Sequence, residues 1–121
     1  MNCLHAATAA VIATIVAAPT TAQIYPTRPV RILVGYAPGG GVDVAARIVA
    51  QGLTDVWGNQ TAIVENRPGA AGGIATEVTA TANPDGHTLL LCTIASHGIT
   101  PARARKLTYD PIKDFSFPTM V

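Results

Sequence analysis

Residues 30–47 read VRILVGYAPGGGVDVAAR, and this stretch decides the fold. Its first part, Val30 to Gly35, is a continuous apolar and β-branched run, which is the pattern of a strand buried on both faces. A proline–glycine turn leads from it straight into an amphipathic helix, for which Gly58 supplies the C-terminal stop. Three successive glycines leave backbone N–H groups uncovered where the helix dipole is positive. The stretch therefore predicts a strand–turn–helix unit with a site for a carboxylate or phosphate at the turn.

The predicted helix should place one apolar face against the sheet. Apolar residues and one glycine recur along it at steps of three and four, and they are Ala45, Ile48, Val49, Gly52, Leu53 and Val56. The opposite face carries the polar side chains Arg47, Gln51 and Asp55. We therefore expect the first set to be buried and the second to face solvent.

The glycine turn fits neither of the two common phosphate-binding signatures well. The spacing from Gly35 to Gly40 copies the start of a P-loop, but Gly41 and Val42 stand where Lys and Ser or Thr are required. A Rossmann fingerprint needs Gly or Ala where the chain has Val44, and Asp43 would put a carboxylate beside the pyrophosphate. A Rossmann-like nucleotide domain of an enzyme stays open only because an acidic residue, Glu65, ends the next predicted strand.

The strand–turn–helix pattern repeats, and a third strand follows it. The predicted elements are a strand at Gln60–Glu65, a glycine-rich turn at Asn66–Gly73, a helix at Ile74–Ala82, a strand at Thr88–Thr93, a loop at Ala95–Thr100 and then a partly helical stretch. This order means right-handed crossovers and a parallel sheet, so we predict a βαβαβ fold of the α/β class. Ligands bind such sheets at the carboxyl ends of the strands.

Two features of these turns have a structural as well as a functional interpretation. Asp43 could contact a ligand, or it could only cap the helix, which Asp does well. The turn Asn66–Gly73 more often serves close packing of the following helix than ligand contact, although it could line the rim of a cleft.

Composition and spacing argue against several other classes of function. The chain has 121 residues, of which 49% are hydrophobic and 12% charged, and its net charge of +1 gives no reason to expect nucleic acid as a partner. His87 and His97 with Cys92 lack a metal-ligand spacing, so we expect surface or loop histidines and no metal or cofactor. Neighbours such as Ser96 and His97 do not easily form a nucleophile–base pair, and no Gly-x-Ser-x-Gly motif surrounds Ser96. We therefore expect no catalysis by Ser96 and His97.

The N-terminus has the pattern of a secretory signal peptide. An apolar run from Ala6 to Ala18 is too short to span a bilayer, and Thr20-Thr-Ala22 is a small-x-small cleavage motif. We predict a signal peptide at residues 1–22, cleaved after Ala22, and hence an exported protein. Cleavage removes Cys3 and leaves Cys92, which we expect inside the third strand, as the one cysteine of the mature chain.

Short motifs in a fixed order along the mature chain resemble those of a known family. They are YPTRPVRI at residues 25–32, PGGGVD at residues 38–43, VENRPGA at residues 64–70, NPDGHTLL at residues 83–90, Ser96-His97, and LTYDPIKDF at residues 107–115. Each motif alone is weak, but their common order is specific. They resemble the periplasmic solute-binding proteins of tripartite tricarboxylate transporters, the TctC or Bug family.

The resemblance implies a two-lobed Venus-flytrap protein of the type II periplasmic-binding-protein class. Such a protein is not an enzyme: it closes around a small di- or tricarboxylate and delivers it to a membrane permease. We therefore expect a periplasmic monomer without catalytic activity. The family holds its ligand with the loop after the first strand and the loop after the third. This implies ligand-binding roles for seven residues: Gly39, Gly40, Gly41, Asp43, Ser96, His97 and, in the cleft wall, Tyr36.

With 121 residues, the sequence is long enough for only part of this two-lobed architecture. Members of the family continue well beyond 121 residues, so we expect residues 23–121 to form the N-terminal part of the first lobe, truncated and without the second lobe. Such a fragment would bind its ligand poorly, because it has no closing jaw. A non-functional gene remnant is therefore a further alternative.

Overall fold

The computed structural model describes residues 25–58, 60–103 and 106–119. The predicted signal peptide and its cleavage after Ala22 lie outside the described residues. Three parallel strands, β1 (Val30–Val34), β2 (Ala62–Asn66) and β3 (Thr88–Leu91), form a sheet in the order β2-β1-β3. Two helices connect them, α2 (Gly41–Trp57) and α3 (Gly73–Ala80). The predicted α/β fold, with its parallel βαβαβ order, is confirmed.

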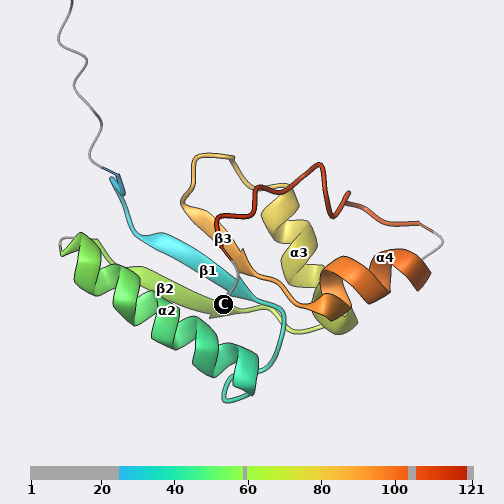
Figure 1. Ribbon diagram of the computed structural model, residues 1–121, viewed down its shortest axis with the longest axis horizontal. Coiled ribbons are helices and arrows are strands. Elements are labelled where there is room, and N and C mark those ends of the chain that lie inside the picture. The colour runs from blue at the N-terminus through green and yellow to red at the C-terminus, as the bar shows by residue number, and fades with distance from the viewer. Residues whose placement is uncertain (1–24, 59, 104–105, 120–121) are drawn as a thin grey trace, which may run out of the picture.

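The two helices lie against different parts of the sheet. Figure 1 shows α2 running along β1 and β2, whereas α3 lies beside β3. The register places Val30 opposite Ala62 and Val34 opposite Asn66, so the carboxyl ends of β1 and β2 finish level with each other. The turns that follow β1, β2 and β3 therefore gather at one edge of the sheet, as a parallel sheet requires.

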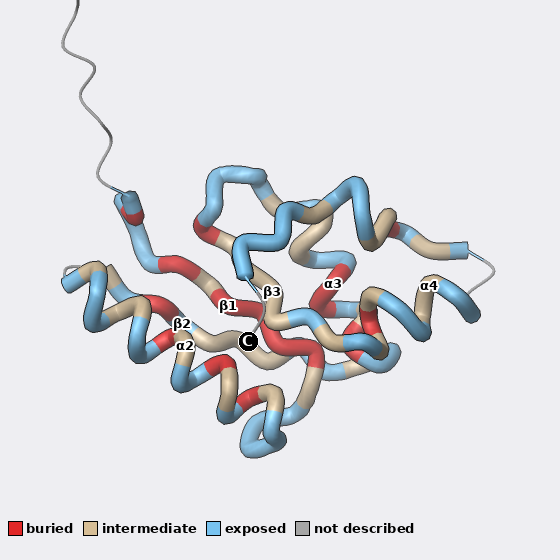
Figure 2. The backbone as a smooth tube through the Cα atoms, viewed as in Figure 1, coloured by how far each residue is buried: buried red, intermediate tan, exposed pale blue. Residues whose placement is uncertain are grey.

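The core is centred on β1, which is buried along nearly its whole length (Figure 2). Ile32 and Val34 pack with Ala46 and Ala50 of α2, and Ala62 of β2 completes this cluster. Continuous burial explains why the strand has no alternation of polar and apolar residues, because a central parallel strand is covered on both faces.

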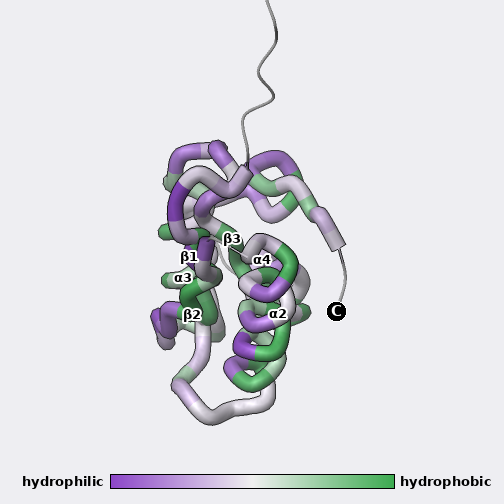
Figure 3. Tube along the Cα trace, turned by 90° about the vertical axis from the view of Figure 1, so that its left-hand side faces the viewer, coloured by the Kyte–Doolittle hydropathy of each residue, from purple (hydrophilic) through white to green (hydrophobic). Residues whose placement is uncertain are grey.

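The predicted orientation of α2 is partly wrong. Val49 and Leu53 do pack against the core, but Gly52 is exposed, and the side chains of Ile48 and Val56 are 69% and 82% exposed. The fully buried positions are the alanines at 46 and 50, whose small side chains let the helix approach the sheet closely. Large apolar residues therefore occur both on the side of α2 that faces the sheet and on the side that faces solvent. Figure 3 shows the position of this helix beside the sheet.

The ends of several elements follow the predicted turn chemistry. Gly58 ends α2 with a φ of 69°, and its N–H donates to the Thr54 carbonyl at 3.0 Å. β3, however, ends at Leu91, so Cys92 lies beyond the strand and is exposed, and its expected place inside the strand is wrong. His87, expected at the surface or in a loop, lies in the bend before β3; it is only 6% exposed, and its Nδ1 lies 3.0 Å from the Asp85 carbonyl.

The glycine-rich turn after β2 packs against the end of β1. It contains a short 3₁₀ turn, η2 (Ala70–Gly72), whose last residue is buried. A Cβ added to Gly35 would lie 2.4 Å from the Cα of Gly72, so the two backbones approach too closely for any side chain at this point. This supports the interpretation of the turn as a packing device.

Residues 95–100 do not form the expected loop. They form a π-helical turn, η3 (Ala95–Ile99), which continues into α4 (Thr100–Arg103). The Tyr109 hydroxyl, 13 residues further along the chain, donates to the Ser96 carbonyl at 2.7 Å and holds this turn. A contact of this kind is not visible in local sequence, which explains the wrong prediction.

Candidate functional site

The exposed turn between β1 and α2 offers backbone donors to solvent. Gly40 is the N-cap of α2, and the first helical hydrogen bond runs from Val44 N to the Gly40 carbonyl at 3.0 Å. The N–H groups of Gly41 and Val42 precede that bond and have no acceptor within the part of the chain that the structure describes. These groups lie at the positive end of the helix dipole, which favours an anion.

Packing does not explain the glycines of this turn. A Cβ added to Gly39 or Gly41 would meet nothing within 4 Å, and one added to Gly40 would meet only the Ala37 carbonyl at 3.6 Å. Only Gly39 has a positive φ, 85°, that disfavours a side chain. The glycines at 40 and 41 therefore leave room for something outside the described chain to approach the backbone.

Asp43 lies beneath the turn, and its carboxylate is buried and fully engaged. Oδ2 accepts from Gly39 N at 2.9 Å and from Arg47 Nε at 2.9 Å, while Oδ1 accepts from Asn66 Nδ2 at 2.8 Å and Arg47 Nη2 at 3.1 Å. The Arg47 guanidinium, aided by the other two donors, holds the pKa of this carboxyl well below its usual range, although burial opposes the shift. Asp43 thus stabilises the start of α2 by a bond back to Gly39, as an acidic residue in a first turn often does.

Tyr36 joins the three turns at this edge of the sheet. Its hydroxyl lies 2.8 Å from Thr93 Oγ1, after β3, and 3.4 Å from the Ala71 carbonyl, after β2. Its own carbonyl accepts from Asn66 Nδ2 at 3.1 Å. The predicted wall residue is therefore a central contact between loops that are far apart in sequence.

Ser96 and His97 do form the close pair that their adjacency argued against. Ser96 Oγ lies 3.0 Å from His97 Nδ1, and both residues belong to the π-helical turn η3. The hydroxyl is nevertheless buried, and it also bonds to the N–H and the carbonyl of Thr93 at 3.2 and 3.1 Å. These bonds close the turn after β3, so the Ser96 hydroxyl has a structural role.

The His97 ring lies within an aromatic cluster. Its centroid is 4.9 Å from Phe115, 5.8 Å from Phe117 and 6.3 Å from Tyr109. Burial lowers the pKa of His97, and Nε2 has no hydrogen-bond partner among the described residues. The ring therefore anchors the segment after α4 onto η3.

Sequence reasoning missed two residues of this edge, Asn66 and Thr93. Asn66 is the last residue of β2 and bonds to both Tyr36 and Asp43, and Thr93 contacts Tyr36. A usable signal existed, because polar residues directly after buried parallel strands meet at the same edge of the sheet. The structure thus brings Tyr36, Asp43 and Ser96 together with two polar residues that the motifs did not single out.

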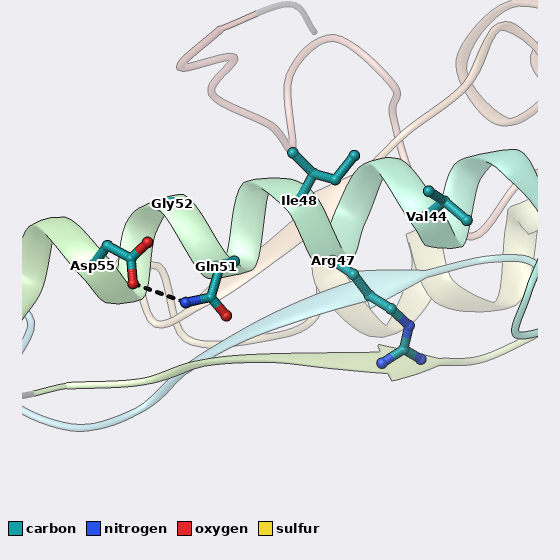
Figure 4. Close-up of a pocket in the computed structure, with 6 residues that line it drawn as sticks. All are labelled: Val44, Arg47, Ile48, Gln51, Gly52 and Asp55. Atoms are coloured by element: carbon teal, nitrogen blue, oxygen red, sulfur yellow. Dashed lines mark hydrogen bonds between the residues drawn. The ribbon is translucent and has the colours of Figure 1, made fainter.

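Two other features do not belong to this edge. A shallow depression of about 530 Å³ lies on the solvent side of α2, and it is lined by Val44, Arg47, Ile48, Gln51, Gly52 and Asp55 (Figure 4).

Glu65, the ribose ligand of the Rossmann alternative, accepts hydrogen bonds from Arg31 Nη2 at 2.6 Å and from Arg67 Nε at 2.7 Å. Both of its oxygens are engaged, so this residue is not free to bind a ribose.

Neither a metal cluster nor a membrane-spanning helix is found in the described parts of the chain. No group of three or more His, Cys, Asp or Glu side chains comes together there. Within the same residues, no helix is long and apolar enough to cross a membrane.

Comparison with known protein sequences identifies relatives. Residues 45–120 match the model of the tripartite tricarboxylate transporter family receptor, TctC. Protein BugT of Bordetella pertussis is 49% identical over 76 residues, which cover 63% of this chain and 23% of BugT. A protein of the UPF0065 group, from the gbd 5' region of Cupriavidus necator, is 34% identical over 94% of this chain and 34% of its own length.

Solved structures agree with the sequence relatives. The periplasmic binding protein BugD superposes with a TM-score of 0.70 at 37% identity, over 75% of this chain and 30% of BugD. MatC from Rhodopseudomonas palustris with bound malate gives 0.70 at 40% identity, over 75% of this chain and 31% of MatC. Another R. palustris protein, with adipate, gives 0.68 at 34% identity, over 72% of this chain and 29% of that protein.

These matches identify the fold as part of a lobe of a periplasmic binding protein. The chain spans between about a quarter and a third of the length of the relatives described above, with shares of 23% and 34% for BugT and the C. necator protein. The family model covers more than half of the chain, so the protein belongs to the TctC family of tripartite tricarboxylate transporter receptors, which are solute-binding proteins.

Proposed function

We propose that this chain forms part of a periplasmic receptor that captures a small dicarboxylate and delivers it to the permease of a tripartite tricarboxylate transporter. One observation carries the proposal. At the end of the turn, the N–H groups of Gly41 and Val42 have no acceptor among the described residues, and packing does not require the glycines at 40 and 41. Two structural neighbours hold malate and adipate, which are both dicarboxylates.

The seven predicted residues take different roles in this proposal. Gly41, together with Val42, presents N–H donors to a ligand carboxylate, Gly40 leaves room for the ligand to approach them, and Gly39 supplies the positive φ that shapes the turn. Tyr36 forms the wall between the three turns. Asp43, Ser96 and His97 support these groups through their contacts within the protein.

The proposal extends to location and assembly. Export by cleavage of the signal peptide after Ala22 would place the protein in the periplasm, where its relative BugD is a binding protein. We propose that the complete two-lobed receptor acts there as a monomer without a cofactor and is not an enzyme. Selective contacts to the far end of the ligand would come from a second lobe.

The substitution Gly40→Val tests the site. Gly40 has an ordinary φ of −76°, so valine fits the backbone, but its side chain covers the adjacent N–H groups. Loss of one or two charge-assisted hydrogen bonds, each worth about 1–3 kcal/mol, should weaken binding of malate or adipate at least about fivefold. Amide chemical shifts measured by NMR during ligand titration detect even weak binding.

Gly52→Ala is the matched control, because Gly52 lies on the exposed side of α2 and an added Cβ meets nothing within 4 Å. It should bind like the wild type. Equal affinity of the Gly40→Val variant and the wild type would exclude this turn as the ligand site. Titration with NAD tests the Rossmann alternative, which predicts that NAD and not the dicarboxylates shifts these resonances.

A further inference from the structure

Asn66 links the turn after β1 to the start of α2. It is the last residue of β2, and its side-chain nitrogen donates to the Tyr36 carbonyl at 3.1 Å and to Asp43 Oδ1 at 2.8 Å. The other oxygen of Asp43 accepts from Gly39 N at 2.9 Å. Both ends of the turn are thus tied, through two side chains, to a strand that lies outside the strand–turn–helix unit.

The residue types suit this linkage. One amide nitrogen carries two protons, so a single short side chain can donate to two acceptors at once. The carboxylate of Asp43 accepts on both oxygens, and Arg47 neutralises it from the next turn of the helix at 2.9 Å. Within the described residues, the groups that face Asp43 are Arg47 on its own helix, Asn66 on β2 and the Gly39 amide.

We propose that Asn66 and Asp43 are positioning residues, which hold the turn at residues 39–41 in the conformation that presents its N–H groups to a ligand carboxylate. The inference rests on the proposed function and adds to it a residue that belongs to none of the predicted ligand contacts. Neither side chain needs to touch the ligand. Preorganised donors bind more tightly, because the ordering of the loop is complete before the ligand arrives.

Two substitutions at Asn66 separate positioning from general stability. In Asn66→Ala the donor is lost at every pH. In Asn66→Asp two carboxylates face each other at neutral pH and the link is broken, but on acidification one of them takes up a proton and can donate one hydrogen bond. The bond between residues 66 and 43 should therefore be restored by acid in the Asp variant and not in the Ala variant. Asn83→Asp, at an exposed turn position, is the matched control.

The experiment uses the full chain, without ligand, and follows the amide resonances of Gly39, Gly40 and Gly41 and the side-chain carboxyl of Asp43 by NMR between pH 3 and 8. We expect the glycine resonances of Asn66→Asp to differ from wild type at pH 7 and to approach wild type near pH 4. Those of Asn66→Ala should differ at both values. Titration with malate at pH 7 should show affinity at least about fivefold weaker in both variants.

The outcomes distinguish this inference from the proposed function. Wild-type glycine resonances and Asp43 titration in both variants would overturn the positioning role, whether or not malate binds. Failure of the wild type to respond to malate would count against the proposed function, while the ligand-free spectra would still test the linkage. If Asn66→Ala does not fold, the return of wild-type resonances in Asn66→Asp on acidification decides the question.

Discussion

Asp43 makes the stability of the protein depend on pH in a defined direction. Arg47 and two further donors lower the pKa of its carboxyl in the folded state. A depressed pKa contributes stability that is complete above the unfolded value of about 3.9 and is lost as the pH falls towards the folded value. In urea unfolding, we therefore expect Asp43→Asn to be clearly less stable than wild type at pH 7 and the gap to narrow at pH 3.

Asp55→Asn provides the comparison for this experiment. Asp55 is exposed on the same helix, and among the described residues its carboxylate accepts only from Gln51 Nε2, at 2.8 Å. This variant should differ from wild type by less than about 0.5 kcal/mol at pH 7. A gap between wild type and Asp43→Asn that stays the same from pH 7 to pH 3 would contradict the assignment of the stabilising charge to Asp43.

Substitution by alanine should have opposite effects on the free energy of unfolding at Gly35 and at Gly52. A Cβ at Gly35 would lie 2.4 Å from the backbone of Gly72, so Gly35→Ala forces two segments apart and should lower the free energy of unfolding by about 1–3 kcal/mol. Gly52 lies within α2 with open space around it, and Gly52→Ala should raise that free energy by about 0.5–1 kcal/mol. Thermal and urea unfolding of the two variants measure the sign of each change in the free energy of unfolding. Equal destabilisation would mean that the close approach at Gly35 is wrong.

The faces of α2 can be tested in the same way. Ala46 is fully buried against the sheet, so Ala46→Leu overfills the core and should cost about 1–3 kcal/mol of unfolding free energy. Ile48 is largely exposed, and Ile48→Leu should change that free energy by less than about 0.5 kcal/mol. The orientation expected from sequence, with Ile48 buried, predicts a larger cost at Ile48 than at Ala46.

The packing of α2 shows why sequence alone predicts the positions of helices and strands better than it predicts which face of a helix is buried. Strands and helices follow from local runs and from glycine turns such as Gly58, and these were recovered almost in full. Which side of a helix packs depends on the distance to the sheet, and here alanines at 46 and 50 set a close approach that large apolar residues do not indicate. Local sequence also gives no sign of the Tyr109 contact that orders η3.

For a related reason, only part of the candidate site could be predicted from the sequence. Glycines 39–41 could be proposed from one continuous motif, because their predicted role depends on the backbone of a single turn. Asn66 and Thr93 act across the sheet edge, from the ends of two other strands. Their roles depend on the strand order, which a list of motifs does not contain. Sequence patterns therefore indicated the glycine turn and the acidic residue at its helix start, Asp43, but not the contacts of Asn66 and Thr93.

The whole fold leaves considerable apolar surface uncovered among the described residues. Ile48 and Val56 project from the solvent side of α2, and Ile94, Ile112 and Phe117 are also largely exposed. Each of β2 and β3 pairs with β1 alone within these residues, so the sheet has two unpaired edges there. Uncovered strands and apolar patches of this kind favour association between copies.

We therefore expect the 121-residue chain to bind an apolar fluorescent dye and to associate as its concentration rises. The double substitution Ile48→Lys with Val56→Lys should reduce both effects and leave the circular dichroism spectrum unchanged, because neither side chain is buried. Gln51→Lys is the matched control, since it adds a charge to the exposed side of α2 without removing apolar surface. Dye fluorescence and sedimentation measure the two effects. If the control lowers association as much as the double variant, added charge and not lost apolar surface is responsible, and α2 does not carry the associating patch.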